Sequence, residues 1–295
     1  MRIVVTGATG MLGSDLCALL AKQASLLGWA RRIDDKAIFP MEPVDITKRE
    51  SVVSSIQRFK PHWMIHCAAL SDVDVCEREP LAAMEINATG TENVAKACRD
   101  AGASLISIST DYVFDGKLSR PYREEDLPHP VNVYGRSKLL AEEASLSFPP
   151  RSAVVRVSGL FGIARDNFVS SVKRAFLSGS KAMAVGHTYS PSYTKDIAQG
   201  IWSLLQKLPS GFRGTFHLSN AGGGSRVDVA LAIGEILEFP NAESLLAVTT
   251  WAALGKPAPR PANSQLECRR FTEMLGTPLR PWKEALRAFL REEGS

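Results

Sequence analysis

Tyr134 and Lys138 are the residues of this sequence whose types and spacing best suit acid–base chemistry. Positions i and i+4 of a helix lie on one face, so the phenol and the ammonium can approach each other there. An unperturbed tyrosine has a pKa of about 10, too high for ready proton exchange near neutral pH. A neighbouring ammonium favours the phenolate, so we expect Lys138 to lower the pKa of Tyr134. Chance and surface pairing also produce this spacing, so the pair needs a second signal.

A glycine-rich segment supplies that signal. Residues 6–13 read TGATGMLG, directly after an apolar strand and at the opening of a helix. Glycine permits a tight turn and a close backbone approach to a pyrophosphate, whose charge a helix N-terminus stabilises. The alternative is a plain strand-to-helix turn with incidental glycines. The segment predicts a dinucleotide-binding loop whose residues are Gly7, Thr9, Gly10, Met11, Leu12 and Gly13.

The residues after the second predicted strand bear on the choice of dinucleotide. A carboxylate there would bind the ribose 2′-hydroxyl, whereas an arginine accommodates a 2′-phosphate. Arg31 and Arg32 follow the strand directly, and the acids Asp34 and Asp35 come later. We therefore expect NADPH as the cofactor, with NADH as the weaker alternative. A solvated basic pair at a strand end is the competing interpretation.

The composition bounds the kind of protein. The chain has 295 residues, of which 45% are hydrophobic and 22% charged, which is typical of one or two globular domains and not of a disordered or fibrous chain. A net charge of 35 − 31 = +4 is too weak to indicate a nucleic-acid partner. The five cysteines and five histidines lack metal-ligand spacing, so no metal is expected. The absence of a signal-like segment and of a long apolar run predicts a cytoplasmic protein that does not enter a membrane.

Apolar runs alternate with helical patterns over the first half of the chain, which predicts a parallel sheet with helices on both faces, a Rossmann-type α/β fold. The predicted strands are residues 3–5, 25–30, 37–39, 62–67, 104–109, 153–157 and 214–218. The predicted helices are residues 13–22, 48–59, 82–101, 133–147, 167–178, 194–206, 227–237 and 282–291. Residues 1–158 are expected to form the dinucleotide-binding domain. Residues 159–295 are expected to form mainly a smaller substrate-binding domain, with parts of 185–220 returning to the first.

Together these motifs resemble the extended short-chain dehydrogenase/reductase superfamily, and within it the dTDP-4-dehydrorhamnose reductases. The motifs that carry the resemblance are TGATGMLG (6–13), HCAALSDVD (66–74), INATGTENVAKAC (86–98), STDYVFDG (109–116), YGRSK (134–138), DNF (166–168) and RPANSQL (260–266). The resemblance covers nearly the whole chain and is most specific in its first 140 residues.

The resemblance implies roles for three catalytic residues. Tyr134 would protonate the substrate carbonyl oxygen as hydride arrives from the nicotinamide. Lys138 would lower the pKa of Tyr134 and hold the nicotinamide ribose. Thr110 would donate a hydrogen bond to the carbonyl oxygen. Asn87 matches an asparagine of the superfamily whose role is structural rather than catalytic.

Further residues are implied in binding. Asp45 and Ile46 would flank the adenine, and Ala68 and Ala69 would line the cofactor after the fourth strand. The implied substrate contacts are Asp111, Asn167, Arg260 and Asn263. For Asn167 and Arg260 the alternative is an ordinary loop residue.

The resemblance also narrows the reaction. Dehydratases of the superfamily carry an Asp-Glu pair after the threonine, whereas Thr110 is followed here by Asp111 and Tyr112. We therefore expect reduction of the 4-keto group of a nucleotide-linked 6-deoxy sugar, foremost dTDP-4-dehydro-L-rhamnose to dTDP-L-rhamnose. Gly159 stands where the reductases often carry a tryptophan near the sugar, so another nucleotide 4-keto sugar stays open.

A non-catalytic alternative comes from a related protein, the regulatory β subunit of methionine adenosyltransferase, which binds NADP. The presence of Thr110, Tyr134 and Lys138 together favours the enzyme. A homodimer is among the assemblies that the sequence allows.

Overall fold

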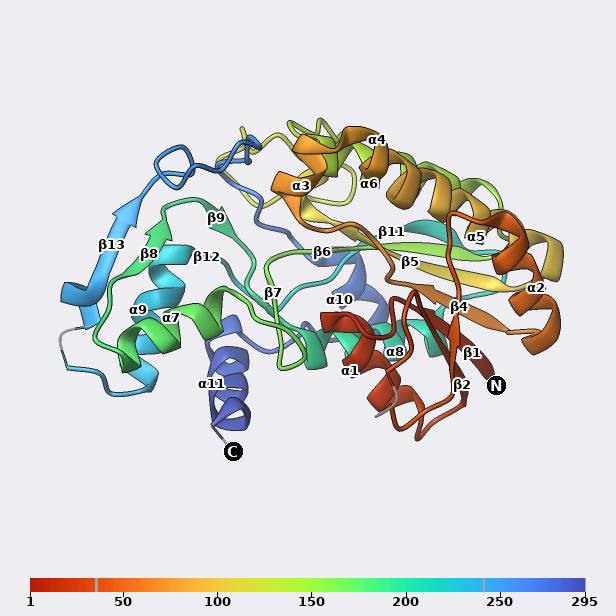
Figure 1. The fold of residues 1–295 in the computed structure, drawn as a ribbon, viewed down its shortest axis with the longest axis horizontal. Coiled ribbons are helices and arrows are strands. Elements are labelled where there is room, and N and C mark those ends of the chain that lie inside the picture. The colour runs from red at the N-terminus through yellow and green to blue at the C-terminus, as the bar shows by residue number, and fades with distance from the viewer. Residues whose placement is uncertain (35–36, 241, 295) are drawn as a thin grey trace.

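The computed structural model describes residues 1–34, 37–240 and 242–294, which form a large lobe around a central sheet and a smaller lobe beside it (Figure 1). The sheet has seven strands in the order β11-β6-β5-β4-β1-β2-β3, and every neighbouring pair is parallel. Its strands are β1 (Arg2–Thr6), β2 (Ser25–Ala30), β3 (Met41–Pro43), β4 (Trp63–His66), β5 (Ser104–Thr110), β6 (Ser152–Val157) and β11 (Arg213–His217). The order is that of a doubly wound Rossmann sheet, as predicted.

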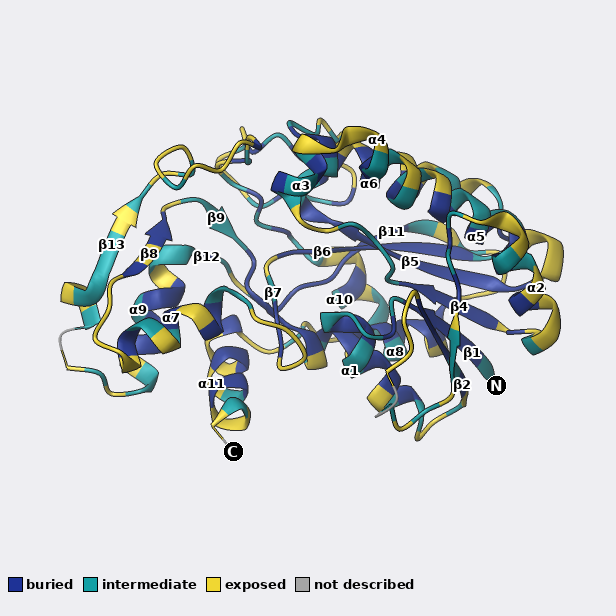
Figure 2. Ribbon diagram, in the orientation of Figure 1, coloured by how far each residue is buried: buried dark blue, intermediate teal, exposed yellow. Residues whose placement is uncertain are grey.

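Helices cover both faces of the sheet because its side chains alternate in direction. Along β1, Ile3 and Val5 enter one core, whereas Val4 enters the core on the opposite face. The first face carries α1 (Met11–Leu20), α8 (Thr194–Lys207) and α10 (Arg269–Leu275), and the second carries α2 (Arg49–Phe59), α5 (Gly90–Ala101) and α6 (Val133–Ser147). The strands are buried almost throughout, while the outer faces of the helices are exposed (Figure 2).

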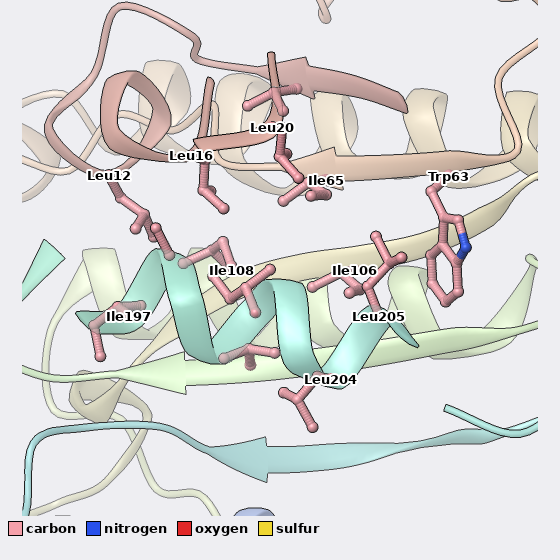
Figure 3. Close-up of a cluster of buried hydrophobic side chains, with 14 of the residues drawn as sticks. Leu12, Leu16, Leu20, Trp63, Ile65, Ile106, Ile108, Ile197, Leu204 and Leu205 are labelled. Atoms are coloured by element: carbon pink, nitrogen blue, oxygen red, sulfur yellow. The ribbon is translucent and has the colours of Figure 1, made fainter. Parts of the chain in front are cut away.

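The first core draws on segments far apart in the chain. Leu12, Leu16 and Leu20 of α1 face α8, which contributes Ile197 and Leu204 (Figure 3). All five side chains are at most 5% exposed. Burying a leucine or isoleucine side chain stabilises a fold by about 1.5–3 kcal/mol. The helix that follows residue 193 is thereby fixed to the glycine-loop helix.

The smaller lobe consists of helices and short strand pairs around a second core. Its elements are β7 (Leu160–Phe161), α7 (Phe168–Leu177), β8 (Ala182–Val185), β9 (Thr188–Tyr189), β10 (Ser192–Tyr193), β12 (Gly224–Ser225), α9 (Arg226–Ile236), β13 (Leu246–Thr249) and α11 (Trp282–Glu293). Phe161, Phe176, Ile233, Leu286 and Phe289 are the centre of its core. No helix in the described part of the chain has the length and apolarity to cross a bilayer.

Two predicted elements differ from the structure. Residues 37–39 do not form a strand, and the edge strand is instead β3, which pairs Gly28 with Met41. The reason is a packing contact: a Cβ atom on Gly28 would lie 2.7 Å from the Phe39 ring, so this apolar residue packs against β2 instead of extending the sheet. The helix predicted over 82–101 is also interrupted.

That interruption is a π-helical turn, Met84–Thr89, between α4 (Pro80–Ala83) and α5. Such turns occur often at functional sites because they re-aim side chains within a helix. The short helix α3 (Val73–Arg78) precedes this segment and was not predicted.

The chain returns to the large lobe after entering the smaller one. Residues 194–207 and 213–217 form α8 and β11 there, and α10 (Arg269–Leu275) packs into the same core. The division into domains at residue 158 stays a prediction.

Candidate active site

The glycine loop lies between β1 and α1, and no side chain caps the N-terminus of that helix. Gly7 has a φ of 65°, which favours glycine, and a Cβ atom on Gly13 would lie 2.1 Å from the Gly7 carbonyl oxygen. Gly10 is the N-cap, no side chain caps the helix, and its first turn carries no acid. The free amide groups of that turn can therefore bind an anion. Thr9, Gly10 and Met11 are partly exposed, whereas the Leu12 side chain lies in the core.

A buried hydrogen-bonded chain holds this loop against the end of β4. The Thr6 hydroxyl accepts from the Ala68 amide at 3.0 Å and lies 2.8 Å from Nδ1 of His66. Nε2 of His66 lies 3.0 Å from the Thr91 hydroxyl. Burial, with a smaller effect of the Lys138 charge, lowers the pKa of His66 to about 3, so the ring is neutral. It packs and positions Ala68 beside the glycine loop.

The residues predicted around the adenosine end lie beyond β2 and β3. Arg31 and Arg32 are exposed, and Asp35 lies outside the described residues. Although burial opposes it, hydrogen bonds from Thr47 and the charges of Lys48 and Arg31 lower the pKa of Asp45. Arg31 and Asp45 thus share one region.

Ile46, next to Asp45, is 7% exposed and packs against Gly90 at the start of α5. Ala69, which follows Ala68 beyond β4, is partly exposed. Both residues therefore lie in segments that follow the carboxyl ends of parallel strands, where ligands bind in such sheets.

The predicted catalytic residues converge at the end of β5. Asn132 caps α6 by accepting from the Gly135 amide at 2.7 Å, which places Tyr134 in the first turn and Lys138 in the second. Thr110 is the last residue of β5, and its hydroxyl lies close enough to Tyr134 to influence the pKa of the phenol. Thr110 and Tyr134 are thereby brought close together, with Lys138 one turn further along the same helix.

The direction of the Tyr134 shift corrects the prediction from spacing. Burial raises the pKa of this phenol, and the hydrogen bond with Thr110 only partly opposes the rise. The carboxylate of Asp111 adds to the rise. Desolvation of the phenolate is the largest effect, so Tyr134 carries its proton, which is the form a general acid needs.

Lys138 is buried as well, with 3% of its surface exposed. Burial lowers its pKa to about 8, and the charge of Glu142, one turn further along α6, opposes that shift. The ammonium is therefore still largely charged at neutral pH, beside the ends of β4 and β5.

Asn87 ties the π-helical turn to the catalytic helix. Its amide donates to the Leu70 carbonyl at 3.0 Å and to the Ser137 hydroxyl at 2.9 Å. Ser137 in turn donates to the Tyr134 carbonyl at 2.8 Å. The side chain thus holds α6 in place, in line with the structural role expected for it.

Asp111 is a buried acceptor for three hydroxyl groups. Ser264 donates to Oδ2 at 2.5 Å, Ser158 to Oδ2 at 2.8 Å and Thr110 to Oδ1 at 3.0 Å. Burial raises its pKa to about 6 against these hydrogen bonds. Its oxygens join β5 to two distant segments, which leaves its predicted substrate contact without support from the geometry.

Arg260 is likewise engaged within the protein. Its guanidinium donates to the Ala258 carbonyl and to Oδ2 of Asp74, both at 2.7 Å. Burial disfavours the charge of Asp74, yet the hydrogen bond from Arg260 lowers the pKa of this carboxyl. Arg260 also hydrogen-bonds with Tyr112, whose ring stands edge-on to Tyr134 with centroids 6.1 Å apart.

The two predicted substrate asparagines hold backbone segments. Asn167 caps α7 by accepting from the Val169 and Ser170 amides at 3.0 and 3.2 Å. The Asn263 amide donates to the carbonyl of Leu118 at 2.8 Å and to that of Arg120 at 3.1 Å. Contacts of these side chains with a substrate stay predictions.

The chain matches a known protein family over nearly its whole length. The model of the RmlD substrate binding domain family matches residues 1–294. The chain belongs to this family. This confirms the resemblance that the motifs indicated.

Three proteins illustrate what the chain is similar to. A dTDP-4-dehydrorhamnose reductase of Mycolicibacterium smegmatis is 38% identical over 97% of this chain and 84% of its own. Methionine adenosyltransferase 2 subunit beta of Mus musculus is 36% identical over 98% of this chain and 88% of its own. The crystal structure of dTDP-4-dehydrorhamnose reductase from Bacillus anthracis in complex with NADP is 32% identical, covers 99% of both chains and has a TM-score of 0.88.

This RmlD-family chain also has a group of side chains that sequence reasoning missed. The Arg226 guanidinium lies over the ring of Phe168 at 4.5 Å, of Trp251 at 5.2 Å and of Tyr189 at 5.8 Å. The four residues come from four separate segments, so no spacing in the sequence connects them. The positive charge of Arg226 acts to lower the pKa of Tyr112 and of Tyr189.

Proposed function

We propose that this protein is an NADPH-dependent reductase that acts on the 4-keto group of a nucleotide-linked 6-deoxy sugar, foremost dTDP-4-dehydro-L-rhamnose. The observation that carries the proposal is the placement of the protonated Tyr134 phenol near Thr110 and one helical turn from Lys138. The Mycolicibacterium smegmatis and Bacillus anthracis relatives bear the name of this activity.

The residues of the glycine loop fit a dinucleotide. The uncapped first turn of α1 offers amide groups to a diphosphate, and a side chain at Gly13 would collide with Gly7. Arg31, exposed beside Asp45, suits a 2′-phosphate and favours NADPH over NADH. When bound, NADPH supplies the hydride.

In the reaction, three side chains handle the carbonyl oxygen and its proton. When substrate binds, the Thr110 hydroxyl turns from Asp111 Oδ1 and donates its hydrogen bond to the carbonyl oxygen, which stabilises the charge that develops there. Tyr134 Oη transfers its proton to the same oxygen, so the product leaves as an alcohol. The charged Lys138 then stabilises the phenolate that Tyr134 becomes.

The surroundings of Thr110 favour simple reduction over dehydration. Elimination needs a further acid–base pair, but Asp111 Oδ2 already accepts hydrogen bonds from the Ser158 and Ser264 hydroxyls. Tyr112 takes the next position, with a pKa raised to about 12 by burial. Neither group is suited to remove a proton from a sugar carbon.

We further propose that the protein works in the cytoplasm. Among the described residues all five cysteines are free, and burial raises the pKa of thiols such as Cys17 and Cys98, which keeps them unreactive. A homodimer stays a prediction.

The similarity to methionine adenosyltransferase 2 subunit beta favours a second candidate, an NADP-binding regulatory subunit without turnover. Mixing the purified protein with NADPH and dTDP-4-dehydro-L-rhamnose separates the two. The reductase proposal predicts stoichiometric loss of NADPH absorbance. If the protein binds NADPH but oxidises it neither with this sugar nor with UDP- or GDP-linked 4-keto sugars, the regulatory role would be favoured.

A further inference from the structure

Arg226 begins α9, and among the described residues its charge is paired with no carboxylate. None of the hydrogen bonds or ion pairs formed among residues 1–34, 37–240 and 242–294 involves its guanidinium. Its contacts there are the rings of Phe168, Trp251 and Tyr189, at 4.5, 5.2 and 5.8 Å. The side chain is partly exposed. A guanidinium stacked on rings keeps its in-plane N–H donors free for an anion.

The neighbouring cations Arg260 and Lys256, unlike Arg226, are paired with a carboxylate. Arg260 and Lys256 both contact the carboxylate of Asp74, at 2.7 and 3.4 Å. The Arg260 guanidinium lies 4.5 Å from the centre of the Trp251 ring, whose Nε1 donates to His187 at 2.9 Å. Arg260 therefore positions Trp251, and Trp251 in turn packs against Arg226.

The position of Tyr189 connects Arg226 and its aromatic neighbours to the reaction site. Gly159 has a φ of 51°, and a Cβ atom on it would lie 2.2 Å from the Tyr189 ring. The ring thus covers the backbone just after β6, where a larger side chain at 159 could not fit. Arg226 affects the titration of both Tyr189 and Tyr112, and Tyr112 stands edge-on to Tyr134. Tyr189 contacts Arg226 and covers Gly159, and the adjacent Ser158 donates to Asp111, the neighbour of Thr110, so these contacts connect the guanidinium to the reaction site.

The chemistry of the proposed substrate fits that placement. In a 4-keto pyranose the reacting C4 and the phosphate-bearing C1 lie at opposite ends of the ring. With C4 at Tyr134, the diphosphate lies one sugar ring away, and a guanidinium binds phosphate oxygens with two parallel hydrogen bonds. We propose that Arg226, held by Phe168, Tyr189 and Trp251, binds the diphosphate of the nucleotide sugar; this rests on the proposed function.

Binding measurements on the NADP-loaded protein test the proposal. Calorimetric titration with dTDP and with thymidine gives the preference for the diphosphate directly. Replacing Arg226→Ala should raise the Kd for dTDP about 10- to 100-fold, the usual effect of losing a hydrogen bond to a charged group. The Kd for thymidine should change far less. Arg226→Lys should fall between, because it keeps the charge but loses the planar fork.

Two controls make the result specific. Arg287→Ala removes an exposed arginine from α11 of the same lobe and should leave the Kd for dTDP unchanged. The affinity of Arg226→Ala for NADP should equal that of the wild type, which shows that the variant is folded.

The outcomes separate this inference from the proposed function. An unchanged Kd for dTDP in Arg226→Ala, or an equal loss for dTDP and thymidine, would overturn the diphosphate assignment even if the wild type reduces the sugar. Wild-type protein that binds none of dTDP, UDP and GDP would also overturn it. A selective loss of dTDP affinity in a protein that never oxidises NADPH would support the diphosphate site and refute the reductase.

Discussion

Arg31 and Arg32 are exposed side chains at the end of β2, where the NADPH preference is expected to arise. Replacing both with alanine should raise KM for NADPH about 10- to 100-fold and leave KM for NADH nearly unchanged, because only NADPH carries the 2′-phosphate. Steady-state kinetics with each cofactor measures this. Arg213→Ala, an exposed arginine on β11, is the control. An equal effect on both cofactors would refute the assignment.

Asp111 predicts a pH dependence of stability. Burial raises its pKa from 3.8 to about 6, so between these values the folded protein retains a proton that the unfolded chain has released. The stability that this group contributes is therefore greatest below pH 3.8 and falls as the pH rises through about 6.

The variant Asp111→Asn cannot titrate and isolates this effect. The unfolding free energy of the wild type minus that of the variant should fall by roughly 3 kcal/mol as the pH rises across this window. Urea unfolding at a series of pH values measures the difference. A difference that rises with pH would show that hydrogen bonds from Ser264, Ser158 and Thr110 outweigh burial.

Single residues show where sequence reasoning stops. The types and spacing of Tyr134 and Lys138 identified the centre of the site, but the direction of the Tyr134 pKa shift depends on burial, which spacing does not report. Arg260 and Asn263 were assigned to the substrate by motif, whereas the structure engages them with Asp74 and with two backbone carbonyls. Partners so distant in the sequence could not be foreseen.

At the scale of elements, a buried ion pair between Arg156 and Glu142 connects α6 to the sheet. Arg156 of β6 donates to both oxygens of Glu142, at 2.8 and 2.7 Å, and both side chains are 5% exposed. Ser109, next to Thr110, donates to the same carboxylate at 2.5 Å. The pair thus positions the helix that carries Tyr134 and Lys138.

Breaking the pair on one side should be costly. Arg156→Met leaves Glu142 charged and buried, which should reduce the unfolding free energy by about 3–5 kcal/mol. The double variant Glu142→Leu/Arg156→Met should lose less than the sum of the two single variants, since no buried charge stays unpaired. Denaturant unfolding of all four proteins tests this. Additive losses would mean that the two side chains act independently.

The glycine turn between β1 and α1 allows a matched pair of substitutions. A Cβ atom on Gly13 would lie 2.1 Å from the Gly7 carbonyl oxygen, whereas one on Gly186 would meet nothing within 4 Å. Gly13→Ala should displace the loop and weaken NADPH binding at least tenfold, while Gly186→Ala should leave it unchanged. Fluorescence titration with NADPH measures both. Equal affinities for the two variants would refute the role of the loop.

Long elements with clear periodicity were predictable, and short ones were not. The helix over 133–147 and the strand over 25–30 have the predicted bounds. Two-residue strands such as β7 and β10 carry no periodicity, because their pairing is fixed by tertiary contacts. The π-helical turn at Met84–Thr89 holds one residue more than an α-helical turn. The apolar pattern continues through it, so periodicity alone predicts one uninterrupted α-helix.

At the scale of the whole molecule, the C-terminal segment joins the two lobes. Lys195 of α8 forms an ion pair with Glu292 of α11. Arg280 binds both oxygens of Asp196 in α8, each at 2.8 Å. The helix that packs on α1 is therefore bound to the smaller lobe as well. The composition and order of elements predicted the two-lobed fold, but only the folded chain brings Arg226, Tyr189 and Trp251 together.

The measurement that tests the central claim most directly follows the hydride itself. The protein is incubated with NADPH deuterated at the transferable position and with dTDP-4-dehydro-L-rhamnose, and the sugar product is examined by mass spectrometry and NMR. The reductase predicts one deuterium at C4, formed about a hundredfold or more slowly by Tyr134→Phe, which still binds NADPH. Unlabelled sugar with intact NADPH, or equal rates for wild type and Tyr134→Phe, would contradict the proposed chemistry.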